Sequence, residues 1–85
     1  MPRLRTPDPD ALRFGVIVRQ LRDERGWTRD KLATRAGLTP QYLAIVEQGG
    51  NVPSLTVVLE LLEVLGADAG AVMLDLLTAR NTPRR

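Results

Sequence analysis

Apolar residues near the start of the chain recur at the spacing of one helix face. Phe14, Val18 and Leu21 stand at positions i, i+4 and i+7, and Ile17 widens the same stripe. The pattern predicts a first helix over residues 10–25 with one core-facing side. Asp10 can cap this helix, and Gly26 can end it. Val16 lies off the stripe, where it either marks a contact surface or has no role.

The next stretch predicts two short helices joined by a tight turn. Thr28 is a suitable N-cap for a helix over residues 29–36, and Gly37 supplies the left-handed position that ends one. Thr39 then caps a third helix with Pro40 at its first position, where a missing N–H costs nothing. One apolar set spans the bend: Leu32, Ala36, Leu38, Leu43 and Val46. This spacing indicates a helix-turn-helix.

Two further helices follow, and both are apolar on every side. Ser54 and Gly66 delimit a fourth helix, and Asp68 caps a fifth that ends near Ala79. A helix without a polar face must be covered, either by a well-filled core within the chain or by a second copy. We expect an isologous dimer through the fifth helix, with the fourth as a possible addition. The expected interface residues are Val72, Met73, Leu74, Leu76 and Leu77.

At specific positions the chain resembles the phage repressor and Cro class of helix-turn-helix proteins, the XRE family. The matching residues in the central pair are Leu32-Ala33, Gly37-Leu38, Leu43, Val46-Glu47 and Gly49. The flanking matches are Phe14-Gly15, Leu21-Arg22, Gly26-Trp27-Thr28, Pro53-Ser54-Leu55 and Leu65-Gly66. The resemblance covers roughly residues 12–77. It implies an all-α, five-helix, lambda-repressor-like DNA-binding domain whose helix-turn-helix is formed by helices 2 and 3.

The resemblance also implies roles for buried residues. In similar repressors the position of Trp27 packs inward against the helix-turn-helix pair. The positions of Arg22 and Glu47 form an ion pair between the first and third helices, which we interpret as structural. Arg29 stands where the family commonly has glutamine, so the family's hydrogen-bond network between this position and the third helix does not carry over directly.

Length and charge set the domain organisation. Eighty-five residues allow one domain. We expect a flexible basic arm over residues 1–9, the DNA-binding domain with its dimerisation helix over residues 10–79, and a basic tail over residues 80–85. Arg3 and Arg5 make the arm either a solvated tail or a DNA contact. Eleven of the 12 basic residues are arginine, which suits bidentate phosphate contacts or reflects a GC-rich genome.

The composition argues against several other classes of protein. The chain has no histidine and no cysteine, so the usual general bases, thiolate metal sites and disulfides are absent. We therefore predict a protein that is not an enzyme and that has no metal and no cofactor. No stretch has the length and apolarity of a membrane span or a signal peptide, so we expect a cytoplasmic protein that does not associate with membranes.

The outward side of the third helix is the predicted DNA contact, because these positions enter the major groove in similar repressors. The expected base-contacting residues, which we call the DNA-facing surface, are Pro40, Gln41, Ala44, Ile45 and Gln48. The expected phosphate-contacting residues are Thr28, Arg29, Thr39, Tyr42 and Asn51. Gln41 can pair with adenine, and Ala44 and Ile45 can contact thymine methyl groups. These contacts predict a preference for AT-rich sites. The surface has no arginine or lysine, so we expect affinity to depend on backbone N–H groups, on Arg29 and on the basic arms.

The sequence therefore predicts a transcriptional regulator that binds specific sequences in double-stranded DNA. We expect a dimeric repressor on a palindromic operator, and within the same class an antitoxin-type or controller-type autoregulator is the alternative. A protein-interaction module on the same fold is a rival hypothesis, because Ile45 and Tyr42 make the third helix weakly polar. The salt dependence of duplex binding distinguishes the two, since specific regulators retain a site that interaction modules lack.

Overall fold

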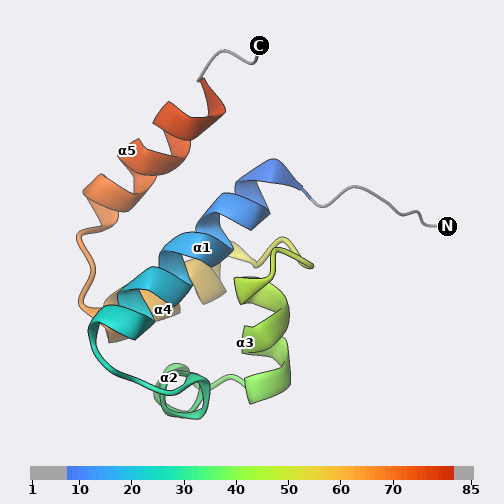
Figure 1. Ribbon diagram of the computed structural model, residues 1–85, viewed down its shortest axis with the longest axis vertical. Helices are drawn as coiled ribbons and strands as arrows, with labels where there is room; N and C mark the ends of the chain where they lie inside the picture. The colour runs from blue at the N-terminus through green and yellow to red at the C-terminus, as the bar shows by residue number, and fades with distance from the viewer. Residues whose placement is uncertain (1–7, 82–85) are drawn as a thin grey trace, which may run out of the picture.

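The computed structural model describes residues 8–81, and within that range it contains five α-helices and no strand (Figure 1). The helices are α1 (Pro9–Glu24), α2 (Arg29–Ala36), α3 (Pro40–Glu47), α4 (Leu55–Leu65) and α5 (Ala69–Arg80). The predicted all-α, five-helix architecture is confirmed. The expected contacts of Arg3 and Arg5 lie outside the described residues. None of the helices described here combines the length and apolarity needed to cross a bilayer.

A side-chain cap begins each helix and fixes its first residue. Thr28, Thr39, Ser54 and Asp68 each accept a hydrogen bond from the backbone N–H three residues later, as expected from the sequence. For α1 the prediction was wrong, because Asp8 is the cap in place of Asp10. These bonds satisfy N–H groups that have no partner inside the helix.

The start of α1 has a simple physical cause. The carboxylate of Asp8 accepts from the N–H groups of Asp10 and Ala11 at 2.9 and 3.1 Å. Pro9 occupies the first helical position, where its fixed φ suits the helix and its missing N–H is not needed. Asp10 therefore belongs to the first turn. At the other end of the chain, α5 includes Arg80, one residue beyond the expected end of the domain.

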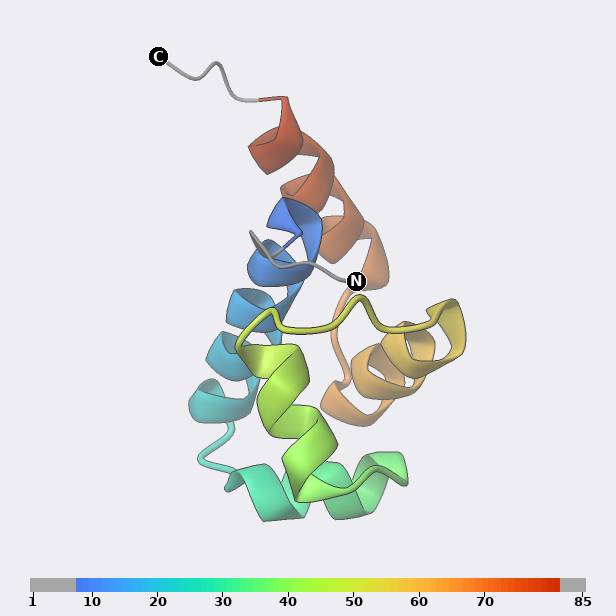
Figure 2. The ribbon, with the colours of Figure 1, turned by 90° about the vertical axis from the view of Figure 1, so that its right-hand side faces the viewer.

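α1 has the most extensive packing of the five helices. It packs against α3, α4 and α5, while α2 packs against α3 and α4 (Figures 1 and 2). The largest fully buried side chains come from four helices: Val18, Leu32, Leu43, Val46, Leu61 and Leu65. The helix-turn-helix pair is thus fixed to the rest of the protein by one continuous core.

Gly15 permits the close approach of α1 to α3. A Cβ atom added at Gly15 would stand 2.4 Å from the carbonyl oxygen of Val46 and 2.6 Å from that of Glu47. Both neighbours are backbone atoms, so they cannot move aside without moving α3. Glycine at this position therefore sets the distance between the two helices.

α5 is attached mainly along one side. Its buried residue is Val72, and it lies against α1 while its end extends beyond the other helices (Figure 2). Two ion pairs reinforce this contact: Arg13 with Asp75 at 2.8 Å, and Arg80 with Asp10 at 3.3 Å. All four of these side chains are substantially exposed, so the pairs add little to stability.

The apolar residues of α4 and α5 divide between core and surface. Leu61, Leu62 and Leu65 are buried within the chain, as is Val72. Five large apolar side chains on the two helices stay exposed: Leu55, Leu59, Met73, Leu74 and Leu77. The intramolecular core therefore accounts for only part of the apolar pattern, and the rest is free to contact a partner.

Candidate nucleic-acid interface

α3 is held by one side and presents the other to solvent. Leu43 and Val46 are fully buried and anchor the helix in the core. Of the DNA-facing surface, Pro40, Gln41, Ile45 and Gln48 are exposed, and Ala44 is half-buried between them. The periodicity of the sequence thus correctly separated the two sides of this helix. Ile45 is 43% exposed, so its apolar side chain is accessible on the outward side of α3.

The residues expected to contact phosphate occupy more varied positions. Thr28 and Thr39 are N-caps, and their hydroxyl oxygens accept from the backbone N–H groups of Lys31 and Tyr42 at 3.0 and 3.1 Å. Each hydroxyl hydrogen is still able to donate to a phosphate. Asn51 is exposed in the loop after α3. Tyr42 is half-buried and packs against the core, so only part of its ring reaches solvent.

Arg22 and Glu47 form the buried ion pair expected from the resemblance. Arg22 Nε donates to Glu47 Oε2 at 2.7 Å, and Arg22 Nη2 donates to Glu47 Oε1 at 3.1 Å. The hydrogen bonds that Arg22 donates to Glu47, with the nearby charges of Glu47 and Asp23, raise the pKa of Arg22, although burial opposes this shift. The guanidinium is therefore always charged, and the two-bond geometry fixes α3 to α1.

Arg29 takes part in the same network, which the sequence did not predict. Its Nε donates to Glu47 Oε1 at 3.3 Å, so α2 is also tied to the end of α3. Its side chain is 39% exposed, compared with 10% for Arg22. A signal was present in the sequence, because an arginine in the place of the usual glutamine can still donate to an acceptor on the third helix.

Trp27 packs partly inward and also carries two cations. Its ring is half-buried against the core, as the resemblance implied. Lys31 Nζ and Arg35 Cζ lie 5.1 and 5.0 Å from the ring centroid, within the range of cation–π attraction. The spacing of four residues between these cations places both on one face of α2, beside Trp27.

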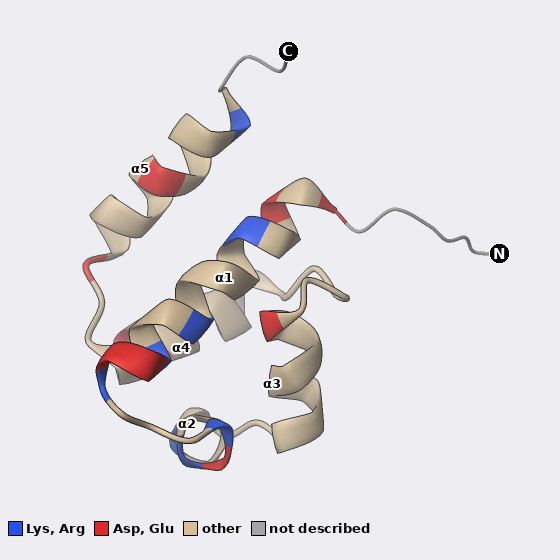
Figure 3. Ribbon diagram, in the orientation of Figure 1, with Lys and Arg blue, Asp and Glu red and all other residues tan. Residues whose placement is uncertain are grey.

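Basic residues cluster on the helices beside α3 and not on α3 itself. Figure 3 shows lysine and arginine on α1 and α2, whereas the charged residue of α3 is the acidic Glu47. Cationic contacts to phosphate at this end of the protein would therefore come from α1 or α2, and helix N-termini add neutral ones. Contacts from α3 to bases must come from neutral side chains.

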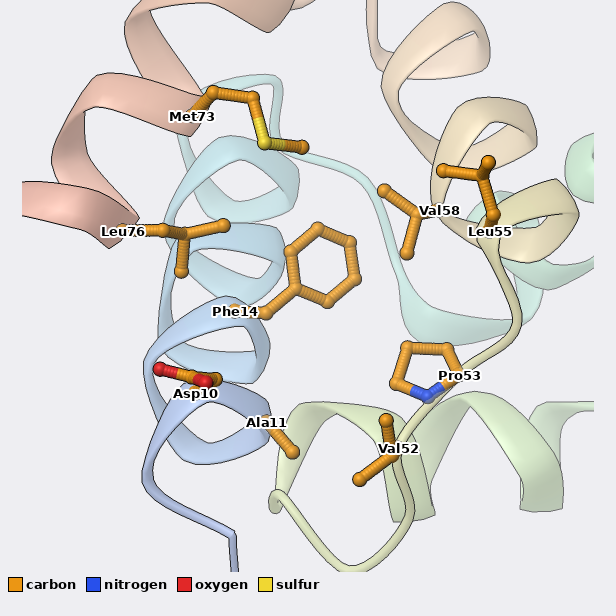
Figure 4. A pocket seen from close by; sticks show the side chains of 9 residues that line it. All are labelled: Asp10, Ala11, Phe14, Val52, Pro53, Leu55, Val58, Met73 and Leu76. Atoms are coloured by element: carbon orange, nitrogen blue, oxygen red, sulfur yellow. The ribbon is translucent and has the colours of Figure 1, made fainter. Parts of the chain in front are cut away.

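The expected dimer residues of α5 face in two directions. Val72 is buried and Leu76 is half-buried, because this side of α5 is turned toward α1. Leu76 and Met73 line an apolar cavity of about 300 Å³ between α1, α4, α5 and the loop before α4 (Figure 4). Val72 is thus a core residue, contrary to its expected place in an interface. Leu74 and Leu77 are 65% and 53% exposed and remain open to a partner.

A third helix whose inward side packs on the second helix, and whose outward side is exposed, defines a helix-turn-helix protein. The chain belongs to the helix-turn-helix domain family, whose model matches residues 13–77. The predicted resemblance to the XRE class is confirmed, since the relatives described below are regulators of this type. Members of this family bind DNA and regulate transcription.

Two curated relatives are similar in sequence. The HTH-type transcriptional regulator RamB of Mycobacterium tuberculosis is 40% identical over 55 residues, which are 65% of this chain but 12% of that protein. The chain thus matches only a small part of that relative's length. The uncharacterized HTH-type transcriptional regulator y4dJ of Sinorhizobium fredii is 36% identical over 52 residues, which are 61% of this chain and 68% of that protein.

Two solved structures have the same fold. The restriction-modification controller protein C.AhdI from Aeromonas hydrophila has a TM-score of 0.71 and 31% identity, covering 76% of this chain and 98% of that one. The clp gene regulator ClgR from C. glutamicum has a TM-score of 0.79 and 22% identity, covering 89% of this chain and 99% of that one. The second likeness concerns the fold alone.

Proposed function

We propose that this protein is a dimeric repressor that recognises a palindromic operator through α3. The observation that carries the proposal is the exposed DNA-facing surface on a helix that the core and the Arg22–Glu47 pair hold rigidly. A rigid helix whose outward side carries both polar and apolar side chains is suited to the major groove, where base edges present hydrogen-bonding groups and thymine methyl groups. Bound at a promoter, such a dimer excludes the transcription machinery.

Base recognition would come from neutral contacts. Gln41 is exposed at the start of α3 and can pair bidentately with adenine. Ile45 and Ala44 lie one turn further on and can pack against thymine methyl groups. No cation of α3 is available for guanine, so the proposed operator half-site is rich in A·T pairs.

Phosphate contacts would flank these bases on both sides. The N-termini of α2 and α3 present the hydroxyls of Thr28 and Thr39 together with backbone N–H groups. Arg29 adds a cation at the start of α2, and Asn51 adds an amide in the loop after α3. Such contacts position the protein on the duplex while the bases specify the site.

Dimerisation would use the apolar residues that the fold leaves exposed. Leu74 and Leu77 on α5 are the centre of the proposed interface, and Leu55 and Leu59 on α4 extend it. Contiguous exposed apolar patches mark protein contacts. A two-fold dimer would place two copies of α3 about one DNA turn apart, which demands a palindromic site.

A controller-type autoregulator is the second candidate. The observation in its favour is the 31% identity to the restriction-modification controller C.AhdI, which spans 98% of that chain. Such a protein would bind upstream of its own gene. Strong binding to that duplex, compared with a shuffled duplex of equal composition, would favour this candidate over a repressor of distant genes.

The proposal is tested by retaining genomic duplex fragments on the protein while the salt concentration rises. Nonspecific binding depends on phosphate contacts and falls steeply with salt, whereas base contacts persist. A specific regulator keeps a small set of fragments after the bulk has been released. Release of all fragments together would contradict the proposal and favour a protein-interaction module that uses Ile45 for another partner.

A further inference from the structure

Glu47 is a buried carboxylate that two arginines share. Its side chain is 1% exposed at the end of α3. Oε2 accepts from Arg22 Nε, and Oε1 accepts both from Arg22 Nη2 and from Arg29 Nε. The two arginines approach from α1 and α2, so this one carboxylate joins three helices.

The two arginines differ in what they have left to donate. Arg22 uses all three nitrogens within the protein, because its Nη1 donates to the carbonyl oxygen of Trp27 at 2.9 Å. Arg29 uses Nε, and its Nη1 and Nη2 have no hydrogen-bond acceptor among residues 8–81. An arginine carries four N–H groups on these two nitrogens, which match the geometry of a phosphate.

The position of the free guanidinium edge follows from its anchor. Glu47 directly precedes Gln48, an exposed member of the DNA-facing surface. The 3.3 Å bond to Glu47 and the 39% exposure of Arg29 together place this side chain partly in solvent beside the last turn of α3. The linked ion pairs contain three arginines and two acids, which leaves one positive charge: Arg19, Arg22, Arg29, Asp23 and Glu47.

We infer that Glu47 is a positioning residue that holds Arg29 by its Nε edge and aims its Nη edge at one DNA phosphate. This inference rests on the proposed DNA binding and adds a specific device to it. The buried carboxylate orders the arginine before DNA arrives, so less side-chain freedom is lost on binding. The same network that fixes α3 thus also prepares a phosphate clamp.

Substitutions at Arg29 separate a positioned clamp from a simple charge. Arg29→Ala removes the clamp. Arg29→Lys keeps the positive charge, but its single ammonium group cannot bind Glu47 and also present a planar pair of donors to a phosphate. Arg35→Ala is the matched control, because it removes an equal charge from α2 without touching Glu47. Each variant is titrated with a duplex that the wild-type protein selects, over a range of salt concentrations.

The expected results have a clear order. Arg29→Ala weakens binding about tenfold or more and lowers the salt slope by about one per protomer. Arg29→Lys restores the salt slope but not the affinity, and Arg35→Ala changes affinity much less. Equal affinity of Arg29→Lys and wild type, or equal losses in Arg29→Ala and Arg35→Ala, would overturn the inference while leaving the proposed function intact.

A measurement on the free protein tests the anchor without DNA. The Nε–H of Arg29 should give a resolved and slowly exchanging NMR signal, as should that of Arg22. Fast solvent exchange at Arg29 Nε alone would overturn the positioning role. If the wild-type protein binds no duplex at all, the proposed function and the clamp both fail, whatever this signal shows.

Discussion

Individual side chains of α3 either anchor the helix or face outward. Leu43 and Val46 fill the core and cannot be changed without loss of stability, whereas Gln41 and Ile45 contribute nothing to the core. Outward residues of this kind are free to be chosen for binding. Their substitution should therefore alter DNA binding without unfolding the protein.

Gln41→Ala is expected to weaken binding to the specific site by about 1 to 3 kcal/mol, because the proposed bidentate contact to one base would be lost. Stability should be unchanged, since Gln41 is exposed. Titration against duplexes that differ at one base pair should show relaxed preference at a single position. Unchanged preference at every position would remove Gln41 from the base contacts. Thr34→Ala, at an exposed position of α2 outside the DNA-facing surface, serves as the control.

Arg22→Ala is expected to destabilise the fold by about 3 to 5 kcal/mol, because it leaves the buried carboxylate of Glu47 without its two-bond partner. Arg29 still donates to Glu47 in this variant, so we expect the loss of stability to lie near the lower end of this range. Urea denaturation measures the change. Arg13→Ala breaks an exposed pair and should cost about 1 kcal/mol or less. Similar losses in the two variants would mean that burial of the Arg22 pair is energetically unimportant.

The sequence predicted some of these residue contacts and not others. The Arg22–Glu47 pair followed from the resemblance, because both residue types stand at matching positions. The bond of Arg29 to the same carboxylate did not, since it depends on the distance between α2 and the end of α3. The two cations over Trp27 were missed for a similar reason, because ring orientation is set by packing.

Helix bounds were the most predictable property at the scale of elements. α2 and α4 have the predicted bounds, because a capping hydroxyl marks each start and a glycine with positive φ marks each end. α1 begins earlier than predicted because Asp8 and Asp10 are both capable of capping. The choice between them depends on Pro9, whose preference for the first helical position decides the outcome.

The spacing of α1 and α3 leads to a prediction about Gly15. Gly15→Ala should destabilise the protein by about 2 kcal/mol or more, because the new methyl group overlaps backbone oxygens of α3. Gly70→Ala is the control on α5, where the nearest atom to the new Cβ is a carboxylate oxygen of Asp68 at 3.3 Å. That change should stay within about 1 kcal/mol. Equal urea midpoints for Gly15→Ala and wild type would show that α3 moves away at little cost.

The assembly is a question for the whole molecule, and here the sequence pattern was ambiguous. α5 is apolar on every side, so its periodicity gives no direction for the core. Only the packing against α1 shows that Val72 points inward and that Leu74 and Leu77 point outward. An interface that includes α4 was left open by the sequence, and the exposure of Leu55 and Leu59 now favours it.

Leu77→Glu is expected to give a folded monomer, because a charge would be buried at the proposed apolar interface. Its DNA affinity should be weak, because a monomer cannot bind both half-sites at once. Val16→Glu is the matched control, at a position of α1 that is 42% exposed. Sedimentation equilibrium gives the assembly state, and circular dichroism checks the fold. If Leu77→Glu remained a dimer and Val16→Glu became a monomer, the dimer interface would have to lie on α1 instead.

The most direct test of sequence-specific recognition by a dimer is selection from random duplex DNA with the purified protein at near-physiological salt. We expect a motif with two inverted, AT-rich half-sites whose centres are about one helical turn apart. Such a motif also supplies the operator to search for upstream of genes. Recovery of no motif by a folded protein would contradict the proposed function, and α3 would then be a surface for another protein.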